Sequence, residues 1–143
     1  MKMQLKKVTL HTTKPVQAID ITPEIHKAVK ENPVNNGMVF ILTLHTTAGL
    51  VVTEKLPCLE QDILETLEKL IPEHRDYHHN RYLESYGRLG INAASHLRSI
   101  IAGTSLFFPI QGGEIVMGNA QNVYFLEFDG PVKRTYCIQI MGE

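Results

Sequence analysis

The sequence lacks most of the features that assign a chain quickly to a class of protein. It contains no tryptophan and only two cysteines, Cys58 and Cys137, which lie far apart and not in a CxxC arrangement. Such a pair predicts reduced thiols rather than a disulfide framework. The most apolar run, MVFILTLH, is far shorter than the ~20 residues that cross a bilayer. We therefore expect a cytoplasmic protein that has no membrane as a partner.

A strong excess of charge is also missing. The chain has 14 lysine and arginine residues against 15 aspartate and glutamate residues, a formal net charge of −1. Because a polyanion-binding surface usually gives a clear basic excess, nucleic acid is not an expected partner. The HExxH, Walker A, nucleophile-elbow and zinc-deaminase motifs are absent too, so the sequence does not predict the enzyme classes that those motifs define.

Hydrophobic patterning predicts a single α+β domain over residues 1–143. Apolar residues in strand-like runs indicate strands, and apolar residues three or four positions apart indicate helices. The expected strands cover 5–12, 17–21, 38–45, 50–54, 104–110, 114–117, 121–128 and 132–140, and the expected helices cover 22–31, 58–71 and 92–103. Thr22 is the expected N-cap of the first helix. Residues 73–91 have no clean period and are expected to form a long loop, which in a compact domain is usually functional.

Three histidines in separate segments are the main candidates for chemistry. His45 lies in LHTTAGL, His79 in DYHHN and His96 in NAASHL. Each stands among small or polar residues near the end of an expected element. Imidazoles from three elements can meet at one metal ion, one phosphate group or one proton-transfer site. The functional hypothesis is that these three do so.

The positions of these residues within the expected elements favour the edge of a cleft. His96 lies about 100° around its helix from Leu97, just outside the apolar stripe. Asp62 occupies a similar margin on the preceding helix, from which it could bond to a neighbouring imidazole. His45 shares a strand face with Thr43 at the mouth of an apolar slot.

Two carboxylates near the C-terminus need a partner. Glu127 and Asp129 fall on one strand face, where they require a cation, a metal or hydrogen-bond donors. Arg134 is the nearest basic residue in the sequence that follows.

Each candidate also has a purely structural interpretation. His45 could bond to a backbone carbonyl at the end of its strand, and Asp62 could be an ordinary first-turn helix acid. His78 and His79 could be solvated loop residues. The two C-terminal carboxylates could cap a turn.

Taken together, the motifs resemble those of the YjbQ family. They are HTTAG followed by Glu54, then Asp62, DYHHN, NAASHL, AGTSLFFPI and EFDGP followed by an arginine, in family order over nearly the whole chain. The resemblance implies an α+β fold that assembles as a homotrimer, with a β-sandwich core of about seven or eight mostly antiparallel strands and two or three helices. The residues that match the family pattern are His45, Glu54, Asp62, His79, Asn92, His96, Gln121, Glu127 and Asp129.

The chain departs from the family pattern at two loops. Where the family often has GTWQG, residues 118–122 read GNAQN, so an indole ring is missing. Where the family has DGPR, residues 129–132 read DGPV, which moves the nearest guanidinium to Arg134.

The resemblance also implies thiamine-phosphate synthase activity, a transferase reaction in which a thiazole nitrogen displaces pyrophosphate. We expect His45, Asp62, His79 and His96 to act on a phosphorylated small molecule. The expected ligand contacts are Thr46, Thr47, Glu54, Asn92, Gln121, Glu127, Asp129 and Arg134.

A divalent metal, Zn or Mg, would be held by His45, His79 and His96 if the three rings converge on it. Asp62 or Glu54 would then orient one of the imidazoles. Direct contact of the histidines with a phosphate is the other interpretation of the same residues. Two further functions stay open: metal-assisted hydrolysis of a phosphorylated metabolite, and a non-catalytic trimer that binds a metabolite or a metal.

Overall fold

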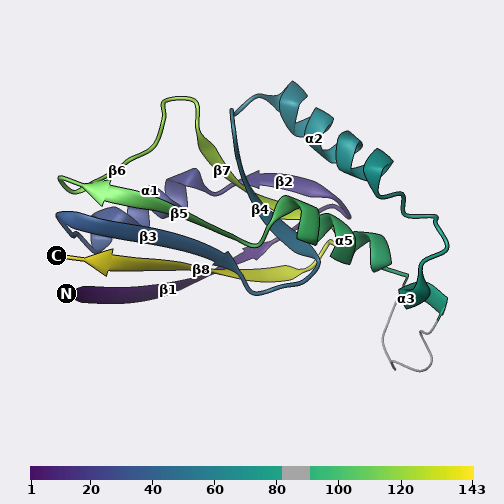
Figure 1. Cartoon of the computed structure of the whole chain (residues 1–143), viewed down its shortest axis with the longest axis horizontal. Helices are drawn as coiled ribbons and strands as arrows, with labels where there is room; N and C mark the ends of the chain where they lie inside the picture. Colours follow the sequence, from purple (N-terminus) through teal and green to yellow (C-terminus); the bar gives the residue numbers. More distant parts are fainter. Residues whose placement is uncertain (82–90) are drawn as a thin grey trace.

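The strands of the chain form two antiparallel sheets in a computed structural model that describes residues 1–81 and 91–143 (Figure 1). The five-stranded sheet has the order β1 (Lys2–His11), β8 (Lys133–Gly142), β3 (Asn36–Thr43), β5 (Ser105–Gln111) and β6 (Glu114–Ile115). The three-stranded sheet has the order β2 (Gln17–Asp20), β7 (Asn122–Glu127) and β4 (Ala48–Thr53). All eight of these strands lie where the sequence predicted strands.

Four helices accompany the sheets in the described part of the chain. They are α1 (Thr22–Glu31), α2 (Pro57–Leu70), α3 (His78–Arg81) and α5 (Ala93–Ala102). The α+β class and the antiparallel pairing are therefore confirmed. The short helix α3 forms inside the segment predicted to be a long loop, so the helix count exceeds the expected two or three. Residues 82–90 of that predicted loop lie outside the described residues.

The predicted cap of α1 is wrong. The N-cap position is Ile21, and no side chain caps this helix end. The Thr22 hydroxyl instead accepts a hydrogen bond from the Val123 N–H at 2.8 Å, which joins α1 to β7. A threonine that precedes Pro23 gave the signature of a cap, but the neighbouring strand competes for the same hydroxyl.

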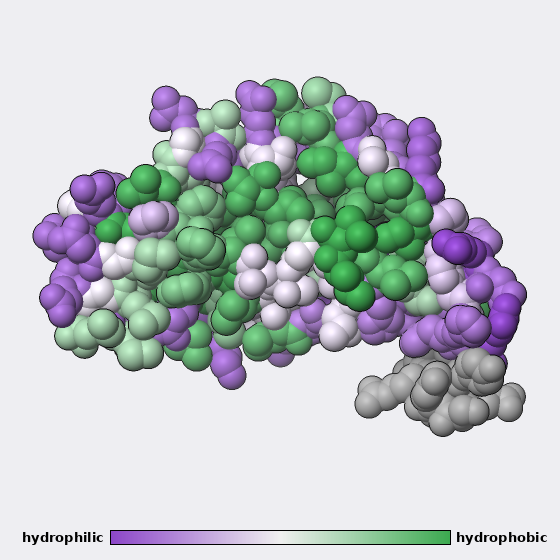
Figure 2. Space-filling model, in the orientation of Figure 1, coloured by the Kyte–Doolittle hydropathy of each residue, from purple (hydrophilic) through white to green (hydrophobic). Residues whose placement is uncertain are grey.

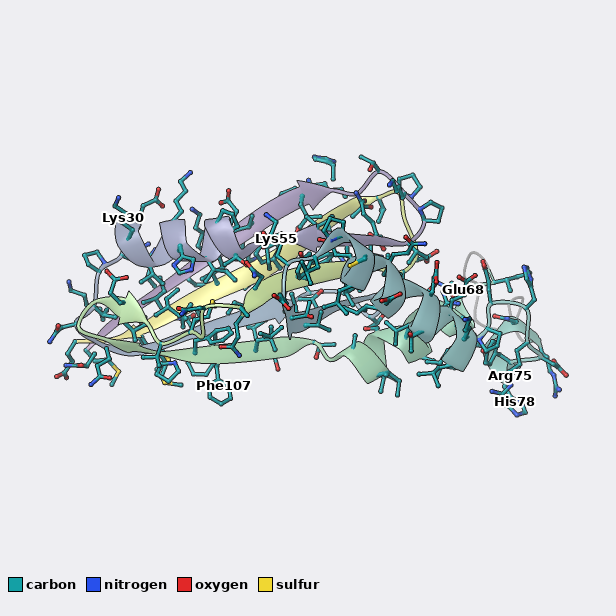
Figure 3. All side chains as sticks on the ribbon, turned by 90° about the horizontal axis from the view of Figure 1, so that it is seen from above. Lys30, Lys55, Glu68, Arg75, His78 and Phe107 are labelled. Carbon is teal, nitrogen blue, oxygen red and sulfur yellow. The ribbon has the colours of Figure 1, made fainter. Side chains whose placement is uncertain are left out.

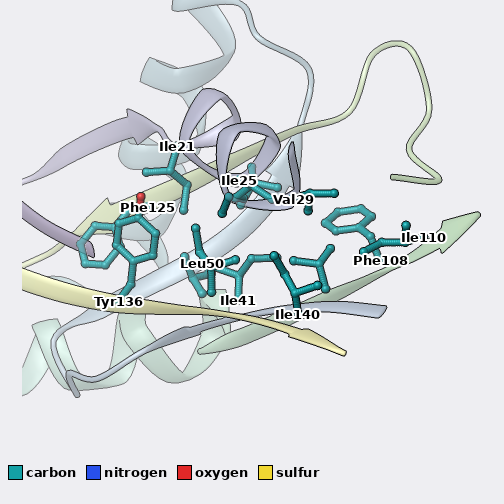
Figure 4. Packing of buried hydrophobic residues seen from close by; sticks show 14 of the residues in the cluster. Ile21, Ile25, Val29, Ile41, Leu50, Phe108, Ile110, Phe125, Tyr136 and Ile140 are labelled. Carbon is teal, nitrogen blue, oxygen red and sulfur yellow. The ribbon is translucent and has the colours of Figure 1, made fainter. Parts of the chain in front are cut away.

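The main core lies between the inner face of the five-stranded sheet, one face of the three-stranded sheet, and α1. Figure 4 shows isoleucine and aromatic side chains from all three meeting in one layer. On β3 and β8 every second residue points into this core, which is the alternation expected for a sheet with one buried face. The other face of the three-stranded sheet packs against α2 through a smaller cluster of Leu67, Tyr124, Leu126 and Phe128.

The opposite face of the five-stranded sheet has no helix over it among the described residues (Figure 1). Phe107, on that face of β5, is 63% exposed. None of the helices in residues 1–81 and 91–143 combines the length and the apolarity that a membrane crossing requires.

The central strand β3 offers a direct test of the core. Val39 is fully buried, whereas Val116 is 50% exposed, so Val39→Ala and Val116→Ala delete the same atoms in opposite environments. Loss of buried surface plus the cavity left behind should lower the free energy of unfolding of Val39→Ala by about 2 kcal/mol. The Val116→Ala change should stay within about 0.5 kcal/mol. Urea unfolding measures both, and equal effects would contradict this packing.

Candidate functional site

A buried ion pair lies at the end of the three-stranded sheet where β7 meets β4. Glu127, the last residue of β7, is fully buried, and Arg134 near the start of β8 is 6% exposed. Arg134 donates from Nε to Glu127 Oε2 at 2.7 Å and from Nη2 to Glu127 Oε1. Burial alone would raise the pKa of Glu127, but the hydrogen bonds from Arg134, the Asp129 N–H and Thr12, together with the charge of Arg134, outweigh it and hold that pKa below its usual range. Within the described residues, no other ion pair has both side chains buried.

This ion pair holds three loops. Arg134 Nη2 also donates to the hydroxyl of Thr47, in the β3–β4 loop, at 2.8 Å. Thr12, which follows β1, donates its hydroxyl to Glu127 Oε2 at 3.0 Å. The N–H of Asp129, in the β7–β8 loop, donates to Glu127 Oε1 at 2.8 Å. Both oxygens of the carboxylate are thus used inside the protein, where they fix the ends of the surrounding strands.

His45 lies beside this ion pair, and one of its ring nitrogens is already engaged. Its Nε2 accepts a hydrogen bond from the Thr135 N–H at 2.9 Å. The proton of the neutral ring is therefore on Nδ1. Burial, and then the positive charge of Arg134, lower the pKa of His45 against the opposing effect of Glu127. A backbone bond was expected from the structural interpretation of His45, although the partner is an N–H rather than a carbonyl.

His79 and His96 lie next to each other near the N-terminal end of α5. Their ring centroids are 5.2 Å apart, and the ring planes are inclined by 54°. The two rings line a cavity of about 360 Å³, and its other walls are Tyr77, His78, Ala93 and Leu97. His45 is not part of this lining. Within one chain the three candidate histidines therefore form a pair and a separate member, not a common cluster.

Two buried polar atoms beside this pair have no hydrogen-bond partner within residues 1–81 and 91–143. They are Nδ1 of His79 and Oδ1 of Asn92. Asn92 occupies the N-cap position of α5 without capping it, because its Nδ2 donates to Asp129 Oδ2 at 3.0 Å. Asn80 Oδ1 takes over part of the cap by accepting from the Ala93 N–H at 3.4 Å. Unsatisfied buried groups are costly, which makes this place a candidate for a ligand.

The electrostatics at His96 favour the neutral imidazole. Burial, and then His79, lower the pKa of His96, while the Thr46 backbone and Asp129 oppose the shift. A neutral ring keeps one nitrogen as an acceptor and one as a donor. Neutral His96 can therefore form a hydrogen bond to an incoming group.

α5 is also tied to the same end of the sheet as the ion pair. The Ser95 hydroxyl donates to the Phe128 carbonyl at 2.6 Å, and the Ser99 hydroxyl donates to the Ala48 carbonyl. Both serines are buried. These bonds bring His96 and Asn92 toward the β7–β8 loop that carries Asp129.

The metal set predicted from the sequence is not assembled in one chain. Within residues 1–81 and 91–143, no group of three or more histidine, cysteine, aspartate or glutamate side chains is placed to hold a metal ion. The physical reason is that Nε2 of His45 faces the backbone of β8. The groups near the pair are two imidazoles, the Asn92 amide oxygen and the Asp129 carboxylate. They suit an ion that keeps most of its water or substrate ligands better than a metal held by the protein alone.

Three other candidates lie elsewhere. Asp62 is exposed on α2 and lines a separate cavity with Leu59, Ile63 and Ile101, where no histidine is present. Glu54 is exposed just beyond β4, and Gln121 closes a turn by accepting from the Gly118 N–H at 2.8 Å. Thr53 pairs with Asn122 at one end of the three-stranded sheet, and Ala48 pairs with Glu127 at the other. Glu54 and Gln121 adjoin the first end, which is about 17 Å from the end that holds Glu127.

Sequence reasoning missed four residues that shape the site. Tyr77 lines the cavity, Asn80 bonds to the first amide of α5, and Thr12 and Ser95 hold the β7–β8 loop. Tyr77 and Asn80 flank the two histidines in DYHHN, so the motif itself was a usable signal. Thr12 and Ser95 carry no local signal, because their partners are 115 and 33 residues away.

Comparisons with known proteins match nearly the whole chain. A family model described as UPF0047 protein YjbQ-like matches residues 6–143. A UPF0047 protein of Archaeoglobus fulgidus is 37% identical over 134 residues, which cover 94% of this chain and 98% of the relative. The UPF0047 protein YugU of Bacillus subtilis is 33% identical over 139 residues, which cover 96% and 99%.

Solved structures agree with these sequence matches. A YbjQ-like protein of unknown function from Sulfolobus solfataricus superposes with a TM-score of 0.92 at 29% identity and covers 99% of both chains. An uncharacterised YjbQ/UPF0047 protein from Clostridium acetobutylicum superposes with a TM-score of 0.85 at 34% identity and covers 95% of this chain and 99% of its own.

The lowered pKa of His45 predicts how stability depends on pH. In the unfolded chain this histidine titrates near pH ~6.5, so below that pH the unfolded state binds more protons than the folded state. The free energy of unfolding should therefore fall as the pH drops from ~6.5 toward the lower folded pKa. A His45→Gln variant keeps an acceptor for the Thr135 N–H but does not titrate, so its loss of stability on acidification should be smaller.

Urea unfolding at about pH 7 and about pH 5 measures this difference. His26→Gln, at an exposed position of α1, is the matched control and should follow the wild-type dependence. If His45→Gln loses as much stability on acidification as the wild type, the Thr135 bond does not act in this way.

Proposed function

The chain belongs to the UPF0047 YjbQ-like family, as its motifs predicted, and on that premise we propose that the His79–His96 pair binds a phosphorylated small molecule together with a divalent cation. The observation that carries the proposal is that two buried atoms have no hydrogen-bond partner among the described residues: Nδ1 of His79, which lines a cavity of ligand size, and Oδ1 of Asn92, which precedes the cavity residue Ala93. A bound ligand would satisfy both atoms, and that removes the cost of leaving them unpaired.

The polar groups at the pair divide into two kinds. Asn92 Oδ1 and the Asp129 carboxylate are acceptors, which suit the water molecules around a hydrated magnesium ion. The imidazoles of His79 and His96 can donate to phosphate oxygens. Mg²⁺ usually reaches a protein through one or two side chains plus the phosphates of its substrate, so fewer than three protein ligands are sufficient.

The cavity also has walls that suit an organic group. Tyr77, Ala93 and Leu97 supply apolar surface beside the imidazoles. Ligand pockets commonly combine such walls with a few converging polar groups. A small molecule that carries both a phosphate and an apolar part therefore fits this cavity better than inorganic phosphate alone.

The activity we propose for this site is the transferase reaction of thiamine-phosphate synthesis. The thiazole nitrogen forms a bond to the pyrimidine methylene carbon, and the bond from that carbon to the pyrophosphate oxygen breaks. The electron pair leaves with the pyrophosphate, where charge builds up on oxygen. The chain's part in this step is to bind that charge through His79 and His96, and Mg²⁺ supplies further neutralisation when bound.

Binding of magnesium pyrophosphate tests the site directly. His96→Asn removes one imidazole and should weaken binding by about tenfold or more, because a hydrogen bond to a charged group is worth about 1.5 to 3 kcal/mol. His26→Asn makes the same change on the exposed side of α1 and should leave the affinity unchanged. Isothermal titration calorimetry with and without Mg²⁺ measures each affinity. Equal affinities for His96→Asn and the wild type would overturn the assignment of the site.

Turnover separates the functions that this site could serve. Formation of thiamine phosphate from the two precursors, lost in His96→Asn and kept in His26→Asn, supports the transferase. Release of inorganic phosphate from a phosphorylated precursor supports metal-assisted hydrolysis instead. Binding without turnover of either kind indicates a metabolite-binding protein.

We also propose that copies of the chain associate, as a trimer by resemblance, through an exposed apolar face next to the cavity. Figure 2 shows this face as a largely hydrophobic surface over β3, β5 and α5. The exposed apolar residues of α5 and β5 are Leu97 (39%), Ile100 (72%), Ile101 (64%) and Phe107 (63%), and Leu44 (52%) follows β3. Figure 3 shows that Phe107 and His78, a residue of the cavity lining, point to the same side of the molecule. Monomeric proteins rarely expose an apolar patch larger than about 300 to 600 Å², so a large apolar face favours contact with another protein.

A charge on this face should separate the copies. Ile100→Asp places a carboxylate at the most exposed apolar position of α5 and should shift the assembly from trimer toward monomer. Leu56→Asp is a suitable control, because Leu56 is exposed, lies outside this face and occupies the N-cap of α2, where aspartate is favourable. Sedimentation velocity measures the mass. A wild-type monomer, or an Ile100→Asp trimer, would contradict the proposal.

A further inference from the structure

The turn between β1 and β2 packs against the loop that carries Asp129. The Thr12 N–H donates to the Val132 carbonyl at 3.0 Å, and the Thr12 hydroxyl accepts from the Val132 N–H at 2.9 Å. The Gly130 N–H donates to the Pro15 carbonyl, also at 3.0 Å. Both ends of the 129–132 loop are therefore bonded to residues 12–15, which do not line the cavity between His79 and His96.

Gly130 leaves no space between the two segments. A Cβ atom at this position would lie 2.4 Å from the Lys14 carbonyl oxygen, 2.8 Å from Thr12 Oγ1 and 2.9 Å from Glu127 Cγ. The backbone of Gly130 does not have a positive φ, so the constraint comes from close packing and not from conformation. Any side chain here would push the 129–132 loop away from the β1–β2 turn.

A continuous set of hydrogen bonds runs from this turn to Asn92, the residue before Ala93 of the cavity lining. Thr12 Oγ1 donates to Glu127 Oε2 at 3.0 Å, and Glu127 Oε1 accepts from the Asp129 N–H at 2.8 Å. The Asp129 carboxylate then accepts from Asn92 Nδ2 at 3.0 Å. Because Nδ2 is held in this way, the other atom of the same amide, Oδ1, is left as a buried acceptor with no partner among the described residues, at the start of the helix that carries His96.

We propose that the β1–β2 turn positions the ligand-binding groups of the site, with Thr12 and Gly130 acting through Asp129 on the side chain of Asn92. The inference rests on the proposed function of the His79–His96 pair. Asp129 is exposed, so burial does not fix the direction of its carboxylate, and the hydrogen bonds of its loop do. Thr12 and Gly130 are positioning residues, because neither lines the cavity.

Two matched pairs of variants test this inference. Thr12→Val removes the hydroxyl and keeps the shape, while Thr12→Ser keeps the hydroxyl. Gly130→Ala forces the loop away from the turn, while Gly118→Ala places its Cβ 3.4 Å from the flexible Gln121 side chain and needs little adjustment. Loss of the positioning contacts should weaken binding of magnesium pyrophosphate by about tenfold in Thr12→Val and Gly130→Ala. Thr12→Ser and Gly118→Ala should stay within about twofold of the wild type.

A second readout follows the geometry without any ligand. The side-chain amide of Asn92 gives its own ¹H–¹⁵N signals, assigned by their loss in Asn92→Asp, and these signals should shift in Thr12→Val and Gly130→Ala only. A purely structural role for the turn would lower stability but leave the Asn92 signals and the affinity unchanged, and that result overturns the inference. A shift of the Asn92 signals without any loss of affinity for magnesium pyrophosphate would also overturn the inference.

The two readouts separate this inference from the proposed function. If the wild type binds no magnesium pyrophosphate, the proposed function fails, and the Asn92 signals alone then decide whether the turn sets the geometry of the amide. If Gly130→Ala does not fold, the Thr12→Val and Thr12→Ser pair decides the outcome, because rescue by serine cannot come from packing alone.

Discussion

The buried ion pair between Glu127 and Arg134 is the constraint on which the rest of this structure depends. Two charges removed from water cost several kcal/mol each unless they are paired and fully hydrogen-bonded. Here the carboxylate accepts from Arg134, from the Thr12 hydroxyl and from the Asp129 N–H, and the guanidinium also reaches Thr47. Loss of one partner would leave an uncompensated charge in the core, at a cost of about 3 to 5 kcal/mol. The end of β7, the start of β8 and the loops beside them must therefore keep the positions that satisfy this pair.

The same constraint explains why the site lies where it does. α5 is bonded through Ser95 to the Phe128 carbonyl, one residue beyond Glu127. The next residue, Asp129, contacts Asn92 at the start of that helix. The first turn of α5 then brings His96 next to His79 of α3. The loop at the end of the sheet thus supplies the Asp129 carboxylate, and α3 and α5 supply the imidazoles of His79 and His96.

Most of the fold could be predicted from the sequence, because its elements have local causes. The isoleucines and valines of β3 and β8 alternate with residues of the other face, and Pro57 and Pro72 bracket α2 as helix boundaries. The sequence did indicate Arg134 as the cation for Glu127, because the two residues lie only seven positions apart. The cap at Thr22 was predicted wrongly and the contact of Thr12 with Glu127 was not predicted, since both depend on which strands become neighbours. Thr22 bonds to Val123 across 101 residues, and Thr12 bonds to Glu127 across 115. No periodicity in a single segment carries that information.

The candidate site shows the same division between local and distant causes. HTTAG, DYHHN, NAASHL and EFDGP each contribute residues to one end of the molecule, so the motifs that are far apart in the sequence do lie near one another. What they could not predict is which histidines share a pocket, because the direction of His45 is decided by the Thr135 N–H of another strand. With Nε2 bonded to the backbone of β8, His45 stays at the end of the sheet, whereas His79 and His96 lie together at the cavity.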